Sequence, residues 1–294
     1  MRQPVARQLA ARAPAKVNLT LRVRRRRTDG FHDLSSLVAF AGVGDRLSLD
    51  PGETLSLALD GPGAEAAGPV NDNLVITAAH ALAEQIEGLR LGHFHLDKRL
   101  PVAAGLGGGS SDAAAALRLL ARANGLDPCD PRLMAAARRV GSDVPVCLDP
   151  RARRMEGVGD CLSPALNLPP LFAVLVNCRV AVATPSVFRA LGLTPGAVLE
   201  GPDLPDHLPS DRDGVMACLN AIGNDLEPAA QSVAPQITAV KADLARQKEA
   251  RLVRMSGSGA TVFALTDDRH GAMRLARRMA ERHPGWWVTP TVLR

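Results

Sequence analysis

The 294-residue sequence contains no tyrosine, and only 3% of its residues are aromatic. Proteins that bind single-stranded nucleic acids stack bases on aromatic side chains, so this composition disfavours that class. The five cysteines form no C-x-x-C pair; such an odd, scattered set excludes a disulfide framework and indicates a reducing compartment. No uninterrupted apolar run approaches the ~18 residues of a membrane helix. We therefore expect a cytoplasmic protein without a membrane partner.

Positive charge is concentrated near the start of the chain. The net charge is +5, and five arginines lie within six positions, without which the chain would be neutral: Arg22, Arg24, Arg25, Arg26 and Arg27. Residues 1–28 contain no acidic residue, as in a transit peptide, but residues 15–23 alternate like a strand, and we reject the transit-peptide interpretation. We interpret the run as a solvated strand end or hairpin. The alternatives are an electropositive rim for an anionic substrate and a basic nucleic-acid-binding module.

Short strands and helices alternate unevenly, which predicts an α+β protein. Strands are expected at 15–23, 45–49, 54–59, 91–97, 171–178, 251–255, 261–266 and 286–292, and helices at 73–86, 110–125, 231–248 and 270–282. A Pro/Gly-rich patch at 164–170 separates two predicted domains, residues 1–165 and 166–294. A second such patch, at 192–209, is expected to be a surface loop.

A glycine cluster opens the helix expected at 110–125. Gly105, Gly107, Gly108 and Gly109 precede two serines that begin this helix. Glycines let the backbone approach an anion, and the free N–H groups and dipole of a helix N-terminus favour phosphate. The cluster lacks the third glycine of a Rossmann fingerprint, and the chain has no Gly-Lys pair as in a Walker loop. The cluster thus predicts a phosphate site, rather than a flexible turn, without specifying its kind.

Two further turns contain residues suited to chemistry. Asp143 lies in the turn Gly141-Ser142-Asp143-Val144-Pro145 between apolar segments, where partial burial can tune a carboxylate as a proton acceptor. The alternative is an aspartate that only stabilises its turn. A small-residue turn, Ser256, Gly257, Ser258 and Gly259, separates two expected strands and is by itself a weak signal.

Together these segments resemble the galactokinase, homoserine, mevalonate and phosphomevalonate kinase superfamily (GHMP kinases). The resemblance covers its three motifs: residues 13–19 (Ala-Pro-Ala-Lys-Val-Asn-Leu), 101–111 and 255–260. Within the superfamily, residues 27–32, 72–74, 97–101 and 141–145 match the signature of the 4-diphosphocytidyl-2-C-methyl-D-erythritol kinases. The segments follow one another in the family's order from residue 13 to residue 263.

The resemblance implies a two-domain GHMP kinase fold, with an N-terminal domain like ribosomal protein S5 domain 2 and a ferredoxin-like C-terminal domain. It implies that ATP phosphorylates the 2-hydroxyl of a cytidyl alcohol, with Asp143 as the catalytic base and Lys16 as its partner. The implied ATP-phosphate loop consists of Pro101, Val102, Ala103, Ala104, Gly105, Leu106, Gly107, Gly108, Gly109, Ser110 and Ser111. Asn73 and Lys98 match positions near the adenine; their alternatives are a helix cap and an exposed strand end.

On the substrate side, the resemblance places five residues at the cytidyl pocket: Asn18, Phe31, His32, Thr184 and Phe188. Two aromatic faces can hold a pyrimidine, although Phe31 stands where the family commonly has tyrosine and cannot supply a phenol hydrogen bond. Core packing is the alternative for Phe188. Mg²⁺ is expected with ATP, its protein ligand unknown. The chain is expected to act as a monomer or homodimer without nucleic acid. A homoserine- or mevalonate-type kinase is the alternative within the superfamily.

Overall fold

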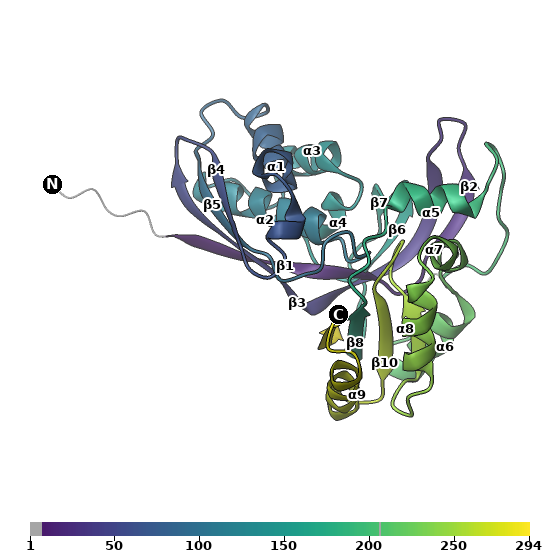
Figure 1. The fold of residues 1–294 in the computed structure, drawn as a ribbon. Coiled ribbons are helices and arrows are strands. Elements are labelled where there is room, and N and C mark those ends of the chain that lie inside the picture. The colour runs from purple at the N-terminus through teal and green to yellow at the C-terminus, as the bar shows by residue number, and fades with distance from the viewer. Residues whose placement is uncertain (1–7, 206) are drawn as a thin grey trace. The chain divides into compact units, whose positions relative to one another are not determined.

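The computed structural model describes residues 8–205 and 207–294, which form two compact units (Figure 1). The first unit takes its described residues from 1–15, 44–102 and 107–149, and the second from 16–43, 103–106 and 150–294. The two units are therefore interleaved in the sequence. The predicted boundary between residues 165 and 166 stays a prediction. The first seven residues of the first predicted domain lie outside the described part of the chain.

The first unit contains a mixed sheet. Its strands are the start of β1 (Leu9–Asn18), the end of β3 (His32–Gly52), β4 (Ser56–Asp60) and β5 (Leu91–Asp97). Strand β5 runs parallel to β4 and antiparallel to β3, and β1 also pairs with β3. Phe94 and Leu96 of β5 are buried, whereas His93 and His95 are exposed. This alternation is what the sequence predicts for residues 91–97, and the strand is confirmed.

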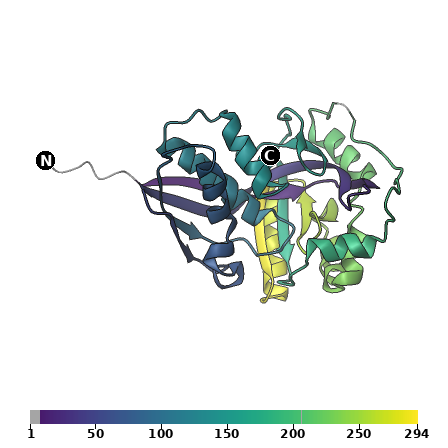
Figure 2. The same cartoon turned by 90° about the horizontal axis from the view of Figure 1, so that it is seen from above.

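Four helices lie beside this sheet (Figures 1 and 2). They are α1 (Leu74–Ala83), α2 (Gly108–Ala123), α3 (Pro131–Val140) and α4 (Val144–Leu148), and two 3₁₀ turns, Glu65–Ala67 and Val70–Asp72, precede them. Helix α2 packs against the other three. Its residues 113–116 are all buried alanines, which allow neighbouring helices to approach closely. The helix expected after the glycine cluster is thus confirmed.

The second unit is built on antiparallel strands. They are the start of β3, β2 (Arg22–Arg26), β6 (Arg153–Gly157), β7 (Cys161–Leu162), β8 (Leu171–Asn177), β9 (Leu252–Met255), β10 (Val262–Thr266) and β11 (Trp287–Leu293). The order β11-β8-β10-β9 places β8 between two partners. All but one residue of β8 are buried, which fits the continuous apolar run in its sequence.

The described residues of the second unit form five helices: α5 (Thr184–Leu191), α6 (Arg212–Ala221), α7 (Glu227–Val233), α8 (Gln236–Ala245) and α9 (Arg269–Arg282). Helix α8 packs on β9 and β10, and α9 packs on β8, β10 and β11. The helix expected at 231–248 is confirmed as α8, but it begins only at Gln236, because the chain leaves the helical conformation at Ala234 (φ −137°, ψ 85°). Pro235 follows and disfavours a helical conformation at the residue before it.

The α+β prediction is confirmed by both units. Within the described residues, no helix combines the length and the apolar character needed to cross a membrane.

Candidate active site

Three sequence segments that lie far apart in the chain are hydrogen-bonded to one another in the second unit. The backbone N–H of Asn18 donates to Ser256 Oγ (3.1 Å), and Ser256 Oγ donates to the carbonyl of Gly105 (2.8 Å). The N–H of Lys16 donates to the carbonyl of Leu106 (2.8 Å). The end of β1, the middle of the glycine loop and the turn after β9 therefore form one structure.

Glycine is required where these segments touch. Gly105 has a φ of +73°, and a Cβ there would overlap the carbonyl oxygen of Ser256. Gly257 has a φ of +57°, and a Cβ would lie 3.2 Å from both Asn18 Oδ1 and the carbonyl oxygen of Gly105. Both positions combine a left-handed backbone with a close approach of another segment: a side chain at Gly105 would overlap its neighbour, and one at Gly257 would be strained and tightly packed.

The glycine loop leads into α2 through alternating left-handed residues. Ala103 (φ +50°), Gly105 and Gly107 (φ +59°) all lie in that region. Among the described residues, no side chain caps the first turn of α2. Its N–H groups and the positive end of its dipole are suited to an anion. The Ser111 hydroxyl is buried and donates to the carbonyl of Pro14 (2.8 Å), so it ties α2 to β1.

The residues predicted to hold the cytidyl group occupy the second unit. The rings of His32 and Phe188 stack with centroids 4.6 Å apart. Burial, helped by the charge of Arg26, lowers the pKa of His32, so its ring is neutral near pH 7. Within the described structure, the buried His32 Nε2 has no hydrogen-bond partner. Phe31 is 64% exposed, and Thr184 Oγ1 lies 2.7 Å from Ser258 Oγ, which connects α5 to the third motif.

The two residues predicted near the adenine have partners within the first unit. Asn73 Oδ1 accepts the N–H of Val75 (3.0 Å), so Asn73 caps α1, the alternative that the sequence left open. Lys98 is buried, which excludes the exposed strand end, and its ammonium lies 2.6 Å from both Asp45 Oδ2 and Asp112 Oδ2. A contact of either residue with the adenine stays a prediction.

Lys16 and Asp143 belong to different units. Lys16 is buried in β1 of the second unit, and Asp143 is half-buried immediately before α4 of the first unit. Their pairing as a catalytic couple therefore stays a prediction.

The arginine run forms strand β2 and a hairpin with β3, as the sequence predicts. Its side chains are paired within the second unit. Arg25 and Arg27 both contact Asp33, each with one contact of 2.5 Å, and Arg22 pairs with Asp225. Arg26 donates to the carbonyl of Leu193 (2.7 Å). Asp33 and Asp225 offset only part of the charge of these four arginines, so the electropositive rim stays an alternative.

Sequence reasoning missed two residues that support the third motif. Asn224 Nδ2 donates to the carbonyls of Met255 (2.9 Å) and Gly257 (2.8 Å). Buried Arg254 donates to the carbonyls of Leu19 (2.7 Å) and Leu219 (2.6 Å), and burial lowers its pKa to about 10. Two sequence features could have indicated these residues. One is the polar Gly-Asn-Asp stretch before α7, and the other is an arginine inside an apolar strand.

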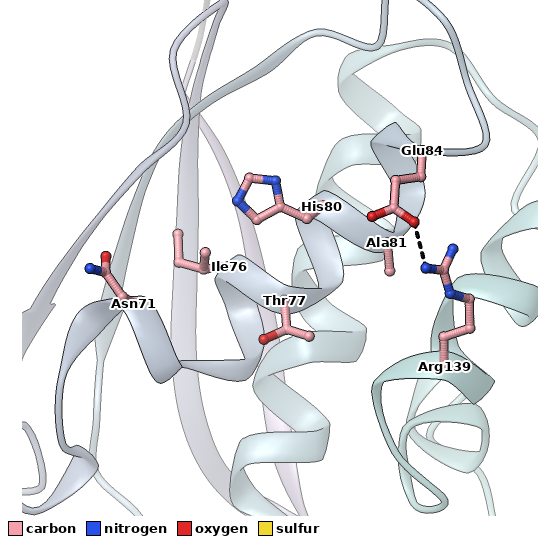
Figure 3. A pocket seen from close by; sticks show the side chains of 7 residues that line it. All are labelled: Asn71, Ile76, Thr77, His80, Ala81, Glu84 and Arg139. Carbon is pink, nitrogen blue, oxygen red and sulfur yellow. Dashed lines mark hydrogen bonds and ion pairs between the residues drawn. The ribbon is translucent and has the colours of Figure 1, made fainter.

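A cavity of about 370 Å³ lies in the first unit beside α1, the helix that Asn73 caps (Figure 3). Its lining comes mainly from α1, and Arg139 of α3 forms an ion pair with Glu84 across it. The residues that line it are Asn71, Ile76, Thr77, His80, Ala81, Glu84 and Arg139. Most of these are exposed, and the cavity holds no buried unpartnered group among the described residues.

Comparisons with known proteins bear on this arrangement. Residues 73–149 match the GHMP kinases N terminal domain, and residues 208–285 match the GHMP kinases C terminal domain. A 4-diphosphocytidyl-2-C-methyl-D-erythritol kinase of Xanthobacter autotrophicus is 65% identical over 290 residues, covering 97% of this chain and 99% of the relative. The enzyme of the same name from Azorhizobium caulinodans is 64% identical, covering 98% and 99%. The chain belongs to this kinase family.

Solved structures agree with this assignment. A crystal structure of 4-(cytidine 5'-diphospho)-2C-methyl-D-erythritol kinase matches 97% of this kinase with a TM-score of 0.77 and 35% identity, covering 99% of that protein. A homoserine kinase of Cytophaga hutchinsonii matches with a TM-score of 0.69, and the match covers 99% of this chain and 99% of that protein. At 18% identity this similarity shows a shared fold alone. The predicted GHMP kinase fold is confirmed.

Proposed function

We propose that this kinase transfers the γ-phosphoryl group of ATP to the 2-hydroxyl of 4-diphosphocytidyl-2-C-methyl-D-erythritol, in the non-mevalonate route to isoprenoid precursors. The names of the relatives give the acceptor alcohol. The observation that carries the proposal is the hydrogen-bonded meeting of Asn18, Gly105 and Ser256, because it joins the family's three motifs in one place. Residues that the sequence separates by more than 200 positions are thereby available to one substrate complex.

The ATP phosphates are proposed to lie against the loop of residues 101–111. Left-handed backbone, as at residues 103, 105 and 107, is typical of loops that bind anions through N–H groups, and the uncapped first turn of α2 offers its own N–H groups and dipole. Both features favour negative charge without a lysine in the loop. Ser111 contributes by anchoring α2, since its hydroxyl is engaged with Pro14.

In the proposed transfer, the substrate 2-hydroxyl oxygen forms a bond to the γ-phosphorus while the bond from that phosphorus to the bridging oxygen breaks. ADP leaves with that oxygen, and the hydroxyl proton passes to the Asp143 carboxylate. Lys16 would keep Asp143 ionised and offset negative charge near the transferred group. Charge stabilisation of this kind supplies most of the acceleration in phosphoryl transfer.

Mg²⁺ is proposed to enter with ATP and to neutralise its polyphosphate. Among the described residues, no group of three or more His, Cys, Asp or Glu side chains could hold a metal ion. We therefore propose that the ion is held mainly by phosphate oxygens and water, as Mg²⁺ often is, and we assign it no protein ligand.

The cytosine is proposed to bind at His32, with Phe31 and Phe188 as aromatic walls. A neutral imidazole whose buried Nε2 lacks a partner can bond to the cytosine edge, and the bond would satisfy that nitrogen. Exposed Phe31 is free to cover a base. Asn18 and Thr184 are proposed to complete the substrate side, and Ser258 connects Thr184 to the third motif.

The adenine is proposed to lie near Asn73 and Lys98. The Lys98 ammonium is engaged by two carboxylates, so only its backbone and aliphatic stem are proposed to border the base. We further propose that the kinase works in the cytoplasm, where its five cysteines stay reduced, as a monomer or homodimer.

A coupled assay of ADP release tests the substrate. The kinase is supplied with ATP and Mg²⁺ and with one of three alcohols: 4-diphosphocytidyl-2-C-methyl-D-erythritol, homoserine or mevalonate. We expect turnover with the cytidyl alcohol alone, and a reaction without alcohol measures background ATP hydrolysis. Turnover of homoserine or mevalonate in place of the cytidyl alcohol would overturn the proposal.

A further inference from the structure

Three charged side chains are buried together in the first unit. Lys98 Nζ lies 2.6 Å from Asp45 Oδ2 and 2.6 Å from Asp112 Oδ2. Their exposed fractions are 4%, 0% and 2%. A buried ion cluster is often no more stabilising than apolar residues of similar volume, so its presence requires a reason besides stability.

Asp45 fixes the chain where it enters the glycine loop. Besides the Lys98 ammonium, this carboxylate accepts the backbone N–H groups of Arg99 (2.6 Å) and Leu100 (2.8 Å) through Oδ1. Leu100 directly precedes Pro101, the first residue of the loop. Three donors on one fully buried carboxylate leave this segment little freedom.

Asp112 and Lys98 fix the chain where it leaves the loop. Asp112 is the fifth residue of α2, the helix that follows the loop. A Cβ on Gly108, the first residue of α2, would lie 3.2 Å from Lys98 Nζ and 3.8 Å from Asp45 Oδ2. The ammonium therefore lies directly against the first turn of α2, and Gly108 leaves room for it.

The charge of the cluster is matched to an anion site nearby. Two ionised carboxylates around one ammonium would carry an excess negative charge, which would repel phosphate. Burial raises the pKa of Asp112 to about 7, although the charge of Lys98 opposes this, and the charge of Asp45 adds to it. Within the described structure, buried Asp112 Oδ1 has no hydrogen-bond partner. Below pH 7 Asp112 is therefore mostly protonated, and the cluster is then neutral.

We propose that Asp45, Lys98 and Asp112 are positioning residues that hold the two ends of the glycine loop together and so fix its N–H groups for the ATP phosphates. The inference rests on the proposed role of the loop in binding ATP. The three side chains act through the loop and α2. They affect ATP without contacting its phosphates.

The decisive variant is Asp112→Ala. It removes the link to α2 and leaves a balanced Asp45–Lys98 pair, so no uncompensated charge remains buried. We expect KM for ATP to rise roughly tenfold, since small misplacements of binding groups have effects of this size, and KM for the cytidyl alcohol to stay within about twofold. Asp112→Asn keeps an oxygen acceptor for Lys98 and should restore KM for ATP. Asp45→Asn tests the residues that lead into the glycine loop, and we expect a similar rise in KM for ATP.

Asp97→Ala is the matched control, because Asp97 adjoins Lys98 in sequence but pairs with Arg99 at the surface. It should leave KM for ATP unchanged. Thermal midpoints are measured for every variant; a purely structural cluster would lower them while leaving KM for ATP unchanged, and this result overturns the inference. An equal rise in the Asp97 variant overturns it too.

Gly107→Ala distinguishes this inference from the proposed role of the loop, because alanine is strained at the left-handed residue that precedes α2. If this variant raises KM for ATP and the Asp112 and Asp45 variants do not, the cluster is not a positioning device. If Gly107→Ala leaves KM for ATP unchanged, the loop is not the phosphate site, and both proposals are wrong.

Discussion

Replacing Asp112 by asparagine should change how the stability of the kinase depends on pH. The carboxyl is almost fully buried, and burial raises its pKa from 3.8 to about 7. Asp45 of β3 and Lys98, which follows β5, are the charged groups that face it. Asparagine keeps the shape and carries no charge, so the variant removes this titration and little else.

The raised pKa of Asp112 determines whether stability rises or falls with pH. Because the pKa is raised on folding, the folded protein holds the proton more tightly than the unfolded chain does, and stability falls as the pH rises from about 4 to about 7. A shift of about three units at ~1.36 kcal/mol per unit corresponds to roughly 4 kcal/mol over the whole window, and about 2–3 kcal/mol between pH 5 and pH 7. This contribution is complete below pH 4 and is lost above pH 7.

Urea unfolding at pH 5, 6, 7 and 8 measures the effect. The free energy of unfolding of the wild type should fall by about 2–3 kcal/mol more than that of Asp112→Asn between pH 5 and pH 7. Asp97→Asn, which changes an aspartate paired at the surface, should follow the wild type. Parallel curves for the wild type and Asp112→Asn would show that Asp112 does not hold a proton in the fold.

Three other substitutions test the site. Asp143→Asn should lower kcat by a factor of about 10²–10⁴, as removal of a general base does, with ATP affinity near that of the wild type; an active variant would remove Asp143 from that role. Phe31→Ala should raise KM for the cytidyl alcohol far more than KM for ATP, and equal rises would contradict stacking. Asn224→Ala leaves the carbonyls of Met255 and Gly257 without their donor and should lower the free energy of unfolding by about 1–3 kcal/mol, measured in urea; no change would mean that water replaces the amide.

The sequence predicts an element correctly where buried and exposed side chains alternate with the period of that helix or strand. Strand β5 coincides with residues 91–97, because only alternate side chains enter the core. Strand β3 is predicted over 45–49 but spans His32–Gly52, because its two ends belong to different units with different pairing partners. The strand expected at 15–23 is the end of β1 and the start of β2, interrupted after Asn18.

The buried charges could not be predicted from local patterns. Asp45, Lys98 and Asp112 are separated by 53 and 14 positions, and each alone resembles a solvated surface residue. Only the tertiary fold removes them from water and makes their pairing necessary. The same holds for Asn224, whose amide finds two carbonyls in a turn more than 30 positions away.

The glycine cluster, the strongest sequence signal in the chain, has more than one physical cause. A side chain at Gly105 would overlap the carbonyl oxygen of Ser256, whereas a Cβ on Gly108 would make a tight contact of 3.2 Å with Lys98 Nζ and one on Gly109 a contact of 3.3 Å with Leu74 Cδ1. Gly107 is favoured by its left-handed backbone. Close contacts and backbone conformation within the protein therefore favour glycine at these positions before any phosphate is considered. A loop packed this closely against its own fold holds its N–H groups in place before ATP arrives, which is the preorganisation that charge stabilisation in phosphoryl transfer requires.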